Sequence, residues 1–256
     1  MSITTDLKQM ATMQGISLVG VAPVERFAGA PTGHGPRDFV PKAESVVVLA
    51  IKLPETIVER HGYLADAREY TPAVRKRILD VHLYQKQGYA LPNLLLDETA
   101  YKLSLWLEAQ GHRALPFPST PASYTMPDIT TDELGYFGVF SHRHAAVRAG
   151  LGEFGYNNIV VTKEFGPRVR FTSIVTTAPL EASPLVAEPI CQRETCRRCL
   201  DACPSKAITL LPDLPDGVYL DPPSRTYVRG CIDRPASSSQ GTCLAVCPLG
   251  EARPAA

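Results

Sequence analysis

Seven cysteines lie within residues 191–247, and no cysteine precedes them in the 256-residue chain. An odd number of thiols fits pairwise disulfide bonding poorly, whereas thiols gathered in one short segment of a cytoplasmic protein are typical of metal sites. The cysteine segment is therefore expected to fold around a metal centre.

The rest of the chain predicts a cytoplasmic protein without a membrane segment. The N-terminal stretch MSITTDLKQMATMQGISLVGVA has no basic region followed by a long apolar run. No apolar run reaches the length of about eighteen residues that a spanning helix needs. Lys and Arg balance Asp and Glu at 26 each, so the overall charge gives no reason to expect nucleic acid or an anionic membrane as a main partner.

The spacing of the cysteines indicates the kind of metal centre. Bacterial ferredoxins use the run C-x2-C-x2-C-x3-C-P, in which the fourth cysteine binds a second iron–sulfur cluster. The end of this run is present as Cys196, Cys199, Cys203 and Pro204. The stretch CLDACP (199–204) also recurs as CLAVCP (243–248). The two copies predict a small ferredoxin-like module with two clusters.

Two positions depart from the ferredoxin run. Position 193 is arginine, so the run starts at Cys191, and Gln240 stands where the second copy needs a cysteine. The crossing rule predicts two ligand sets, which are Cys191, Cys196, Cys199 and Cys247 for one cluster and Cys203, Cys231 and Cys243 for the other. The second set is one thiolate short. We therefore expect one 4Fe–4S cluster, and either a 3Fe–4S cluster or a 4Fe–4S cluster with an oxygen ligand such as Gln240, Asp233 or water.

Structural zinc is the alternative metal. Zinc also uses cysteine pairs two residues apart and closes with four nitrogen or sulfur ligands. It does not need two C-x3-C-P halves that exchange a ligand, so iron–sulfur clusters explain more of the pattern.

The part before the cysteines predicts an α+β domain. Strands are expected at 16–22, 44–53, 158–162 and 168–177, helices at 5–15, 70–109 and 142–150, and a proline-rich loop at 114–138. One apolar face of the long helix consists of Leu96, Ala100, Leu103 and Leu107, with Trp106 packed in the same core and Gly111 as the stop. The chain thus divides into an α+β domain over 1–182 and a ferredoxin-like module over 183–256.

The stretch GLGEFG (150–155) matches the dinucleotide fingerprint G-x-G-x-x-G. A nicotinamide site requires this fingerprint to follow a strand and open a helix, whereas here it follows a predicted helix and precedes a predicted strand. Two interpretations remain, a tight turn that needs positive φ angles or backbone packed closely against another large ligand.

The motifs together support a family resemblance. AGLGEFGYNNIVV (149–161), GPRVRFTSIVTTAPL (166–180) and the cysteine module resemble the epoxyqueuosine reductase family and related corrinoid-dependent reductases, which include reductive dehalogenases. The resemblance covers about residues 16–250. It implies a nitroreductase-like α+β domain that binds cobalamin and two iron–sulfur clusters that deliver electrons to the cobalt. The expected neighbours of the corrinoid are Gly150, Gly152, Gly155 and Asn157.

Three departures from the family pattern bear on the substrate. Tyr156 replaces the lysine of the usual G-x-x-G-K-N sequence, and Tyr136 stands near the position of the aspartate proton donor. Since related dehalogenases use a tyrosine as acid, the resemblance makes Tyr136 the candidate catalytic residue; the alternative is an ordinary, partly buried loop aromatic. The chain stops nine residues after Cys247, without the helical repeats that help to bind tRNA, so tRNA is not expected as a substrate.

The resemblance implies an enzyme of the oxidoreductase class, an iron–sulfur and cobalamin-dependent reductase. Electrons from a ferredoxin or flavodoxin would pass through two clusters to a corrinoid and then to a small-molecule or corrinoid-protein substrate. An acidic donor would suit the cations around the first cluster, which are Arg193, Arg197, Arg198 and Lys206. Two alternatives stay open: an electron-transfer or corrinoid-activating protein without its own substrate, and a nitroreductase-like flavoenzyme with a ferredoxin tail.

Overall fold

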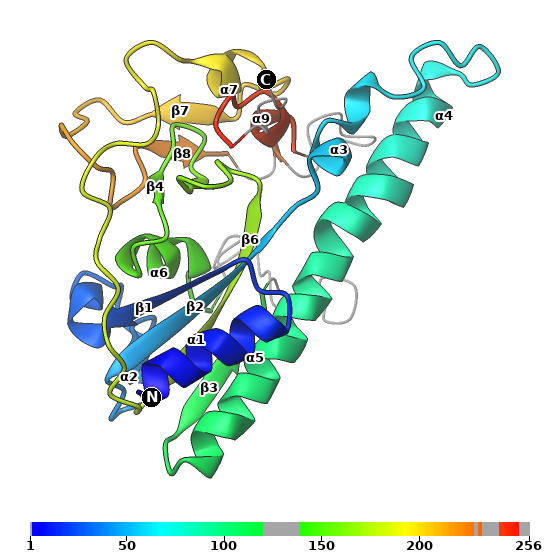
Figure 1. Cartoon of the computed structure of the whole chain (residues 1–256). Helices are drawn as coiled ribbons and strands as arrows, with labels where there is room; N and C mark the ends of the chain where they lie inside the picture. Colours follow the sequence, from blue (N-terminus) through cyan, green and yellow to red (C-terminus); the bar gives the residue numbers. More distant parts are fainter. Residues whose placement is uncertain (1, 120–138, 228–229, 232–240, 251–256) are drawn as a thin grey trace, which may run out of the picture. The chain divides into compact units, whose positions relative to one another are not determined.

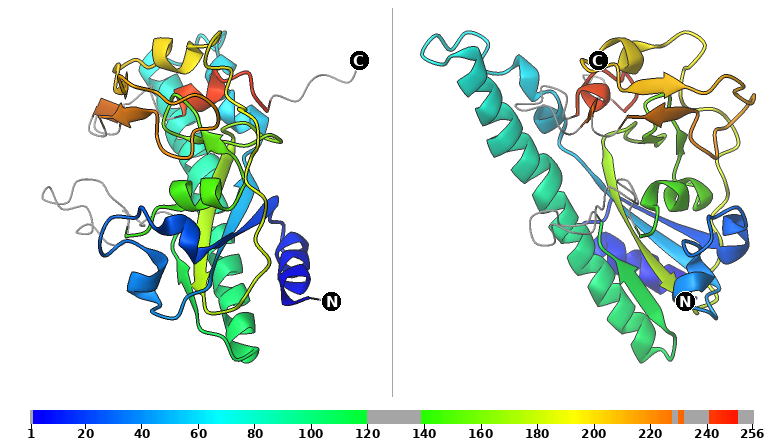
Figure 2. Two further views of the ribbon diagram at one scale, coloured as in Figure 1. Left: turned by 90° about the vertical axis from the view of Figure 1, so that its left-hand side faces the viewer. Right: turned by 180° about the vertical axis from the view of Figure 1, so that it is seen from behind.

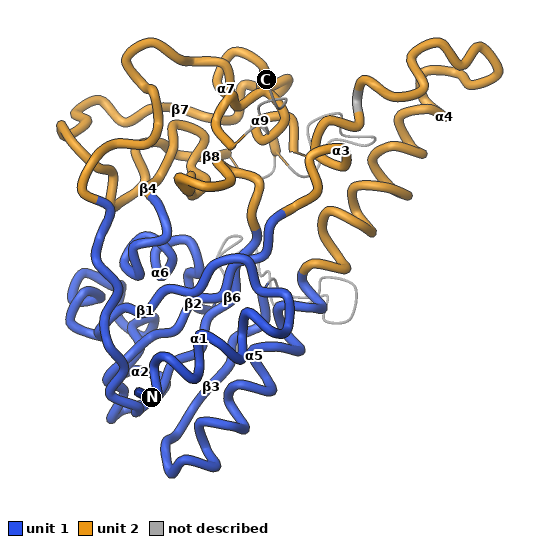
Figure 3. The backbone as a smooth tube through the Cα atoms, in the orientation of Figure 1, with its two compact units in different colours: residues 1–52, 93–152, 170–186 blue, residues 53–92, 153–169, 187–256 orange. Residues whose placement is uncertain are grey.

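The computed structural model describes residues 2–119, 139–227, 230–231 and 241–250. They form two compact units, each made of several chain segments (Figure 3). Unit 1 contains residues 1–52, 93–152 and 170–186, and unit 2 contains residues 53–92, 153–169 and 187–256. The units differ from the two consecutive domains, 1–182 and 183–256, that the sequence suggests, because two earlier segments fold with the cysteines.

Unit 1 is built on a four-stranded sheet in the order β1-β2-β6-β3 (Figure 1). The strands are β1 (Leu18–Pro23), β2 (Ser45–Lys52), β3 (Ala114–Phe117) and β6 (Val169–Thr176). β1 pairs antiparallel with β2, and β3 pairs antiparallel with β6. The apolar run SVVVLA of β2 is buried throughout, as expected for a strand that is covered on both faces.

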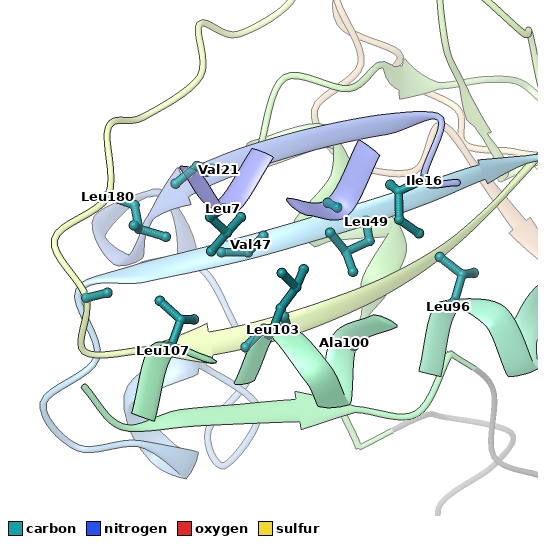
Figure 4. Packing of buried hydrophobic residues seen from close by; sticks show 13 residues of the cluster. Leu7, Ile16, Val21, Val47, Leu49, Leu96, Ala100, Leu103, Leu107 and Leu180 are labelled. Carbon is teal, nitrogen blue, oxygen red and sulfur yellow. The ribbon is translucent and has the colours of Figure 1, made fainter. Parts of the chain in front are cut away.

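Helices cover both faces of this sheet. α1 (Ile3–Met13) and α5 (Leu91–Ala109) pack against one face, where Leu7 and Leu103 share an apolar core with Val47 (Figure 4). α6 (His142–Arg148) contacts β1 and β2 from the opposite side to α1 (Figure 2). Gly20 permits this approach, because a Cβ there would lie 2.6 Å from the Ala149 carbonyl oxygen.

The long helix α5 agrees with the predicted apolar face. Its residues without exposed surface include Leu96, Ala100, Leu103 and Leu107. Trp106 packs against the same core, and the helix ends before Gly111, whose φ is +88°. The shorter elements of unit 1 are the 3-10 helix η1 (Val24–Phe27) and α2 (Pro36–Phe39).

The strand β3 corrects one expectation. The prolines of residues 114–117 predict the start of a long loop, but these residues pair with β6. β3 lies at the edge of the sheet, where Pro116 can lack an N–H group without breaking a central ladder. The rest of that predicted loop, residues 120–138, lies outside the described residues.

His142, the first residue of α6, lies in an environment whose net effect favours its neutral form. Its Nε2–H donates to the Pro118 carbonyl oxygen (2.8 Å), and its Nδ1 accepts from the Ser173 hydroxyl (2.9 Å). Burial, partly offset by the Pro118 hydrogen bond and reinforced by the charge of Arg170, lowers the pKa of His142 from 6.5 to about 4. The unfolded chain therefore binds more protons than the folded chain between these two pKa values.

Stability is expected to fall as the pH drops from about 6.5 towards about 4, by at most about 3 kcal/mol, because His142 must become charged. Above that window its contribution should be complete. Urea unfolding at a series of pH values measures the effect. The substitution H142Q should flatten the dependence, and an equally steep dependence in H142Q would contradict the assignment to His142.

Unit 2 consists of short elements. They are α3 (Glu55–Val58), the 3-10 helix η2 (Arg60–Gly62), α4 (Pro72–Arg77), the π-helix η3 (Ile78–Ala90), β4 (Glu153–Phe154), β5 (Val160–Val161), α7 (Arg198–Asp201), β7 (Ile208–Leu210), β8 (Ser224–Thr226) and α9 (Thr242–Ala245). β4 pairs antiparallel with β5, and β7 pairs antiparallel with β8. Within the described parts of both units, no helix has the length and apolar character to cross a bilayer.

A small apolar core explains why unit 2 is discontinuous in sequence. Leu53 and Val58 pack with Leu244 of α9, and Ile159 and Cys243 lie against them. The early segment thus supplies apolar surface beside the cysteines. Burial of this surface stabilises a region that is otherwise made of loops and short helices.

Candidate metal centre

Four of the seven cysteines line one hollow in unit 2. They are Cys191, Cys196, Cys199 and Cys247, here called the first thiol set, and they are the four that the crossing rule groups together. Cys199 belongs to α7, whereas the other three lie outside the helices. The remaining wall includes Gly155, Tyr156, Asn157 and Arg198. The last glycine of the glycine run therefore shares the wall of this hollow with the four thiols.

The other three cysteines form a second thiol set of Cys203, Cys231 and Cys243. Electrostatic coupling links Cys243 to Cys231 and Cys203, and also to Cys199 of the first set. α7 and α9 are in contact, and each carries one copy of the repeated sequence. Each helix therefore has a cysteine in one thiol set and is followed by a Cys-Pro pair whose thiol belongs to the other set. All seven cysteines are free thiols.

Without a metal, burial raises the pKa of five of these thiols, whereas hydrogen bonds from Ala207 and Ser205 lower the pKa of Cys203 despite its burial. Burial, and then the thiols of the same set, raise the pKa of Cys199 to about 11. Burial, and then Cys231, raise the pKa of Cys243 to about 12. Since metals bind thiolates, binding at either set has to release protons.

The arrangement of the first thiol set suits a polynuclear cluster. In a zinc site four ligands converge on one ion, whereas each thiolate of an iron–sulfur cluster binds a different iron atom, so the ligands surround a space. The first set surrounds a hollow. Across the described ranges, no three His, Cys, Asp or Glu side chains are placed to share a single metal ion.

Cys191 is fixed by a buried carboxylate that the sequence analysis missed. Glu153 has no exposed surface, and its Oε1 accepts from the N–H groups of Ile190 (2.6 Å) and Cys191 (2.7 Å). Its Oε2 accepts from the Tyr219 N–H (2.9 Å) and forms an ion pair with Arg193 (3.2 Å). Arg193 also lies over the Tyr219 ring, 3.6 Å from its centroid. Only 10% of the Arg193 side chain is exposed, so Arg193 offers less surface to an electron donor than the exposed Arg197, Arg198 and Lys206.

Cys247 is fixed by a buried cation. Arg168 has no exposed surface and donates to the carbonyl oxygens of Cys247 (3.0 Å) and Leu249 (2.5 Å). Gly166 allows the same loop to approach, because a Cβ there would overlap the Leu249 carbonyl oxygen. The sequence offered one sign of each buried charge, a charged residue inside a glycine-rich or apolar stretch. Glu153 lies in GLGEFG and Arg168 lies in GPRVRF.

The glycine run does not open a helix, since it follows α6 and leads into β4. The structure thus agrees with the rejection of a dinucleotide fingerprint. Gly150 has a φ of +73°, and a Cβ there would overlap the Pro184 carbonyl oxygen, so the packing of unit 1 itself requires this glycine. Gly152 is buried, and Gly155 and Asn157 line the hollow of the first thiol set. A position beside a corrinoid stays a prediction for all four residues.

Tyr136, the candidate catalytic residue, lies outside the described residues, as do Asp233 and Gln240. Tyr156, at the position of the family's lysine, lines the hollow. Its ring stacks near that of Tyr219, with 6.4 Å between centroids. Tyr156 is therefore a wall residue of the first thiol set.

Curated relatives share substantial sequence with this chain, although no protein-family model matches it. Tetrachloroethene reductive dehalogenase from Desulfitobacterium hafniense is 35% identical over 118 residues, which cover 44% of this chain and 18% of the dehalogenase. Epoxyqueuosine reductase from Bacillus subtilis is 26% identical over 234 residues, which cover 85% of this chain and 50% of the reductase. The enzyme of the same name from Synechocystis sp. is 32% identical over 178 residues, with 70% and 50% covered. The chain thus spans about half the length of these epoxyqueuosine reductases.

Solved structures show the same fold. An epoxyqueuosine reductase with an epoxyqueuosine-modified tRNA stem loop matches 89% of this chain and 55% of its own, with a TM-score of 0.57 and 20% identity. A reductive dehalogenase described for B12-dependent dehalogenation matches 96% of this chain and 31% of its own, with a TM-score of 0.61 and 16% identity.

The fold is therefore the mixed α+β fold of a class of reductases, and its relatives are oxidoreductases by name. The chain belongs to an epoxyqueuosine reductase-like family that is related to the reductive dehalogenases. The family and the α+β class expected from the sequence are confirmed. The nitroreductase-like and ferredoxin-like details, and a cytoplasmic location, stay predictions.

Proposed function

We propose that the chain is an iron–sulfur reductase that works with a corrinoid cofactor. The observation behind this proposal is the hollow lined by the first thiol set, in which Cys247 joins three cysteines that lie far from it in sequence. A thiolate-bound iron–sulfur cluster exchanges single electrons, which suits a member of a reductase family. The first set would bind a 4Fe–4S cluster. The second set would bind a 3Fe–4S cluster, or a 4Fe–4S cluster with one ligand that is not cysteine.

The corrinoid is supported by the relatives, one of which is described for B12-dependent dehalogenation. When bound, a corrinoid supplies the reducing power of its cobalt, and the protein supplies position and shielding from water. The residues proposed beside it are Gly150, Gly152, Gly155 and Asn157, with Tyr136 as proton donor. A ferredoxin or flavodoxin would donate the electrons. Arg197 and Arg198, beside the first thiol set, and Lys206, beside Cys203, are exposed and would suit an acidic donor.

The substrate would be a small molecule, a corrinoid protein or a tRNA. The expectation against tRNA receives no support from the comparisons, because one matching reductase was solved with a tRNA stem loop. An epoxyqueuosine-containing stem loop therefore has to be tested together with halogenated and epoxide compounds.

Anaerobic reconstitution with iron and sulfide, followed by hydroxocobalamin and gel filtration, tests the proposal. Iron–sulfur absorption together with about one corrinoid per chain, reducible by a reduced ferredoxin, is the expected result. Bound clusters without corrinoid would favour the electron-transfer alternative. A fluorescent flavin in place of the corrinoid would favour the flavoenzyme alternative.

A further inference from the structure

We infer that residues 153–169 position the proposed first cluster by fixing the backbones of its two outlying ligands, Cys191 and Cys247, through Glu153 and Arg168. The inference rests on the proposed cluster in the first thiol set. Cys196 and Cys199 lie three residues apart at α7 and are placed by that short turn. Cys191 precedes them by a loop that is longer than in a regular ferredoxin run, and Cys247 comes from the other copy of the repeat. These two ligands need support from outside their own helix.

Glu153 provides this support for Cys191 because a carboxylate can accept all four of its hydrogen bonds. Its two oxygens face three backbone N–H groups and the Arg193 guanidinium. A glutamine has one acceptor oxygen and one NH₂ group, so on one side of the site its NH₂ group would face N–H groups that are also donors. The geometry of the site therefore requires a carboxylate. One of the hydrogen bonds to this carboxylate comes from the backbone of the candidate ligand Cys191 itself.

Arg193 makes this carboxylate compatible with an anionic cluster. A lone carboxylate in a buried position beside thiolates would be repelled by them. Arg193 offsets its charge at 3.2 Å and is itself anchored to the Gly217 carbonyl oxygen (2.5 Å) and the Tyr219 ring. Arg193 stands at the position of the first cysteine in a regular ferredoxin run. It thus balances the charge of Glu153, the residue that fixes the displaced first cysteine, Cys191.

Arg168 provides the corresponding support for Cys247. Its two terminal nitrogens donate to carbonyl oxygens on either side of Pro248. The planar guanidinium fork can bind both carbonyl groups together, whereas a lysine ammonium would bind as a point charge. Arg168, the residue before β6, therefore holds the loop after α9 at two carbonyl groups.

Residues 153–169 are well suited to set the distance between these two supports. β4 and β5 pair with Glu153 opposite Val161, and a further bridge joins Thr162 to Gly166. The same stretch contributes Gly155, Tyr156, Asn157 and Val161 to the hollow. The hairpin carries Glu153 and part of the wall, and the bridged turn that follows it leads directly to Arg168.

Three variants test the inference on the reconstituted full-length chain: E153Q, R193Q and R168K. E153Q and R168K are expected to release the iron of the first cluster to a chelator about tenfold faster than the wild type, because supporting residues of metal ligands have effects of this size. The midpoint potential of the first cluster, followed by EPR, should rise in E153Q and fall in R193Q, because the first removes a negative charge and the second a positive one. A purely structural role predicts no such opposite shifts.

D80N is the matched control, because Asp80 and Arg60 form another buried ion pair in unit 2 (2.8 Å) and neither lines the hollow. D80N should lower stability and leave the potential of the first cluster unchanged. Iron release and potential like those of the wild type in E153Q, R193Q and R168K, or potential shifts of the same sign in E153Q and R193Q, would overturn the inference while the cluster proposal stands. A wild-type chain that binds no iron would overturn the proposed function itself. If E153Q does not fold by circular dichroism, R193Q and R168K decide the question.

Discussion

Replacing Cys199 with alanine is expected to abolish the first cluster. Cys199 is electrostatically coupled to each of the other three thiols of its set, so it lies among them, and alanine offers no atom that can bind iron. The iron content of the reconstituted chain should fall from about seven or eight to about three or four atoms per chain. Iron and sulfide analysis of the purified variant, with EPR of the reduced protein, measures this loss.

C231A is the matched control for C199A, because Cys231 belongs to the second thiol set. It should remove the signal of the second cluster and leave that of the first. The grouping into two sets would be wrong if C199A and C231A removed the same signal. Full iron content in C199A would exclude the first set as a cluster site.

Replacing Gly150 with alanine is expected to lower the free energy of unfolding by about 3 kcal/mol. About 1 kcal/mol comes from the left-handed backbone conformation, since φ at Gly150 is +73°. The rest comes from the overlap of a Cβ with the Pro184 carbonyl oxygen, which is backbone and cannot rotate away. Urea unfolding of the chain without added corrinoid measures the loss.

G111A is the matched control for G150A. Gly111 also lies in unit 1 with a φ of +88°, but a Cβ there would meet no atom within 4 Å. It should cost only about 1 kcal/mol, the backbone part of the effect. Equal losses in G150A and G111A would show that the contact with Pro184 is not a constraint. A loss in G150A that appears only with corrinoid would favour the ligand interpretation of this glycine.

Local periodicity predicted most of unit 1. The face formed by Leu96, Ala100, Leu103 and Leu107 is buried in α5, and the apolar run at 45–50 is a buried strand. These predictions succeeded because one face of a helix, or a whole strand, is fully described by residues close in sequence. β3 was missed because prolines indicate loops, and only its place at the sheet edge makes Pro116 acceptable.

The spacing of the cysteines predicted which thiols of the candidate site lie together. The repeated Cys-Pro ending grouped Cys247 with Cys191, Cys196 and Cys199, and the structure places these four around one hollow. The buried charges behind them were not predictable in the same way. Glu153 and Arg168 lie at least 38 residues from the ligand backbones that they bind, and no local pattern records such a distance.

The sequence by itself determined the α+β class and the family and predicted the candidate ligands, because each depends on residue types at short and regular spacings. Only the tertiary structure decided how the chain divides into units and what positions Cys191 and Cys247. A buried carboxylate is stable only where donors from other segments converge on it. Glu153 finds these donors at residues 190–193 and 219, and their convergence is a property of the folded chain.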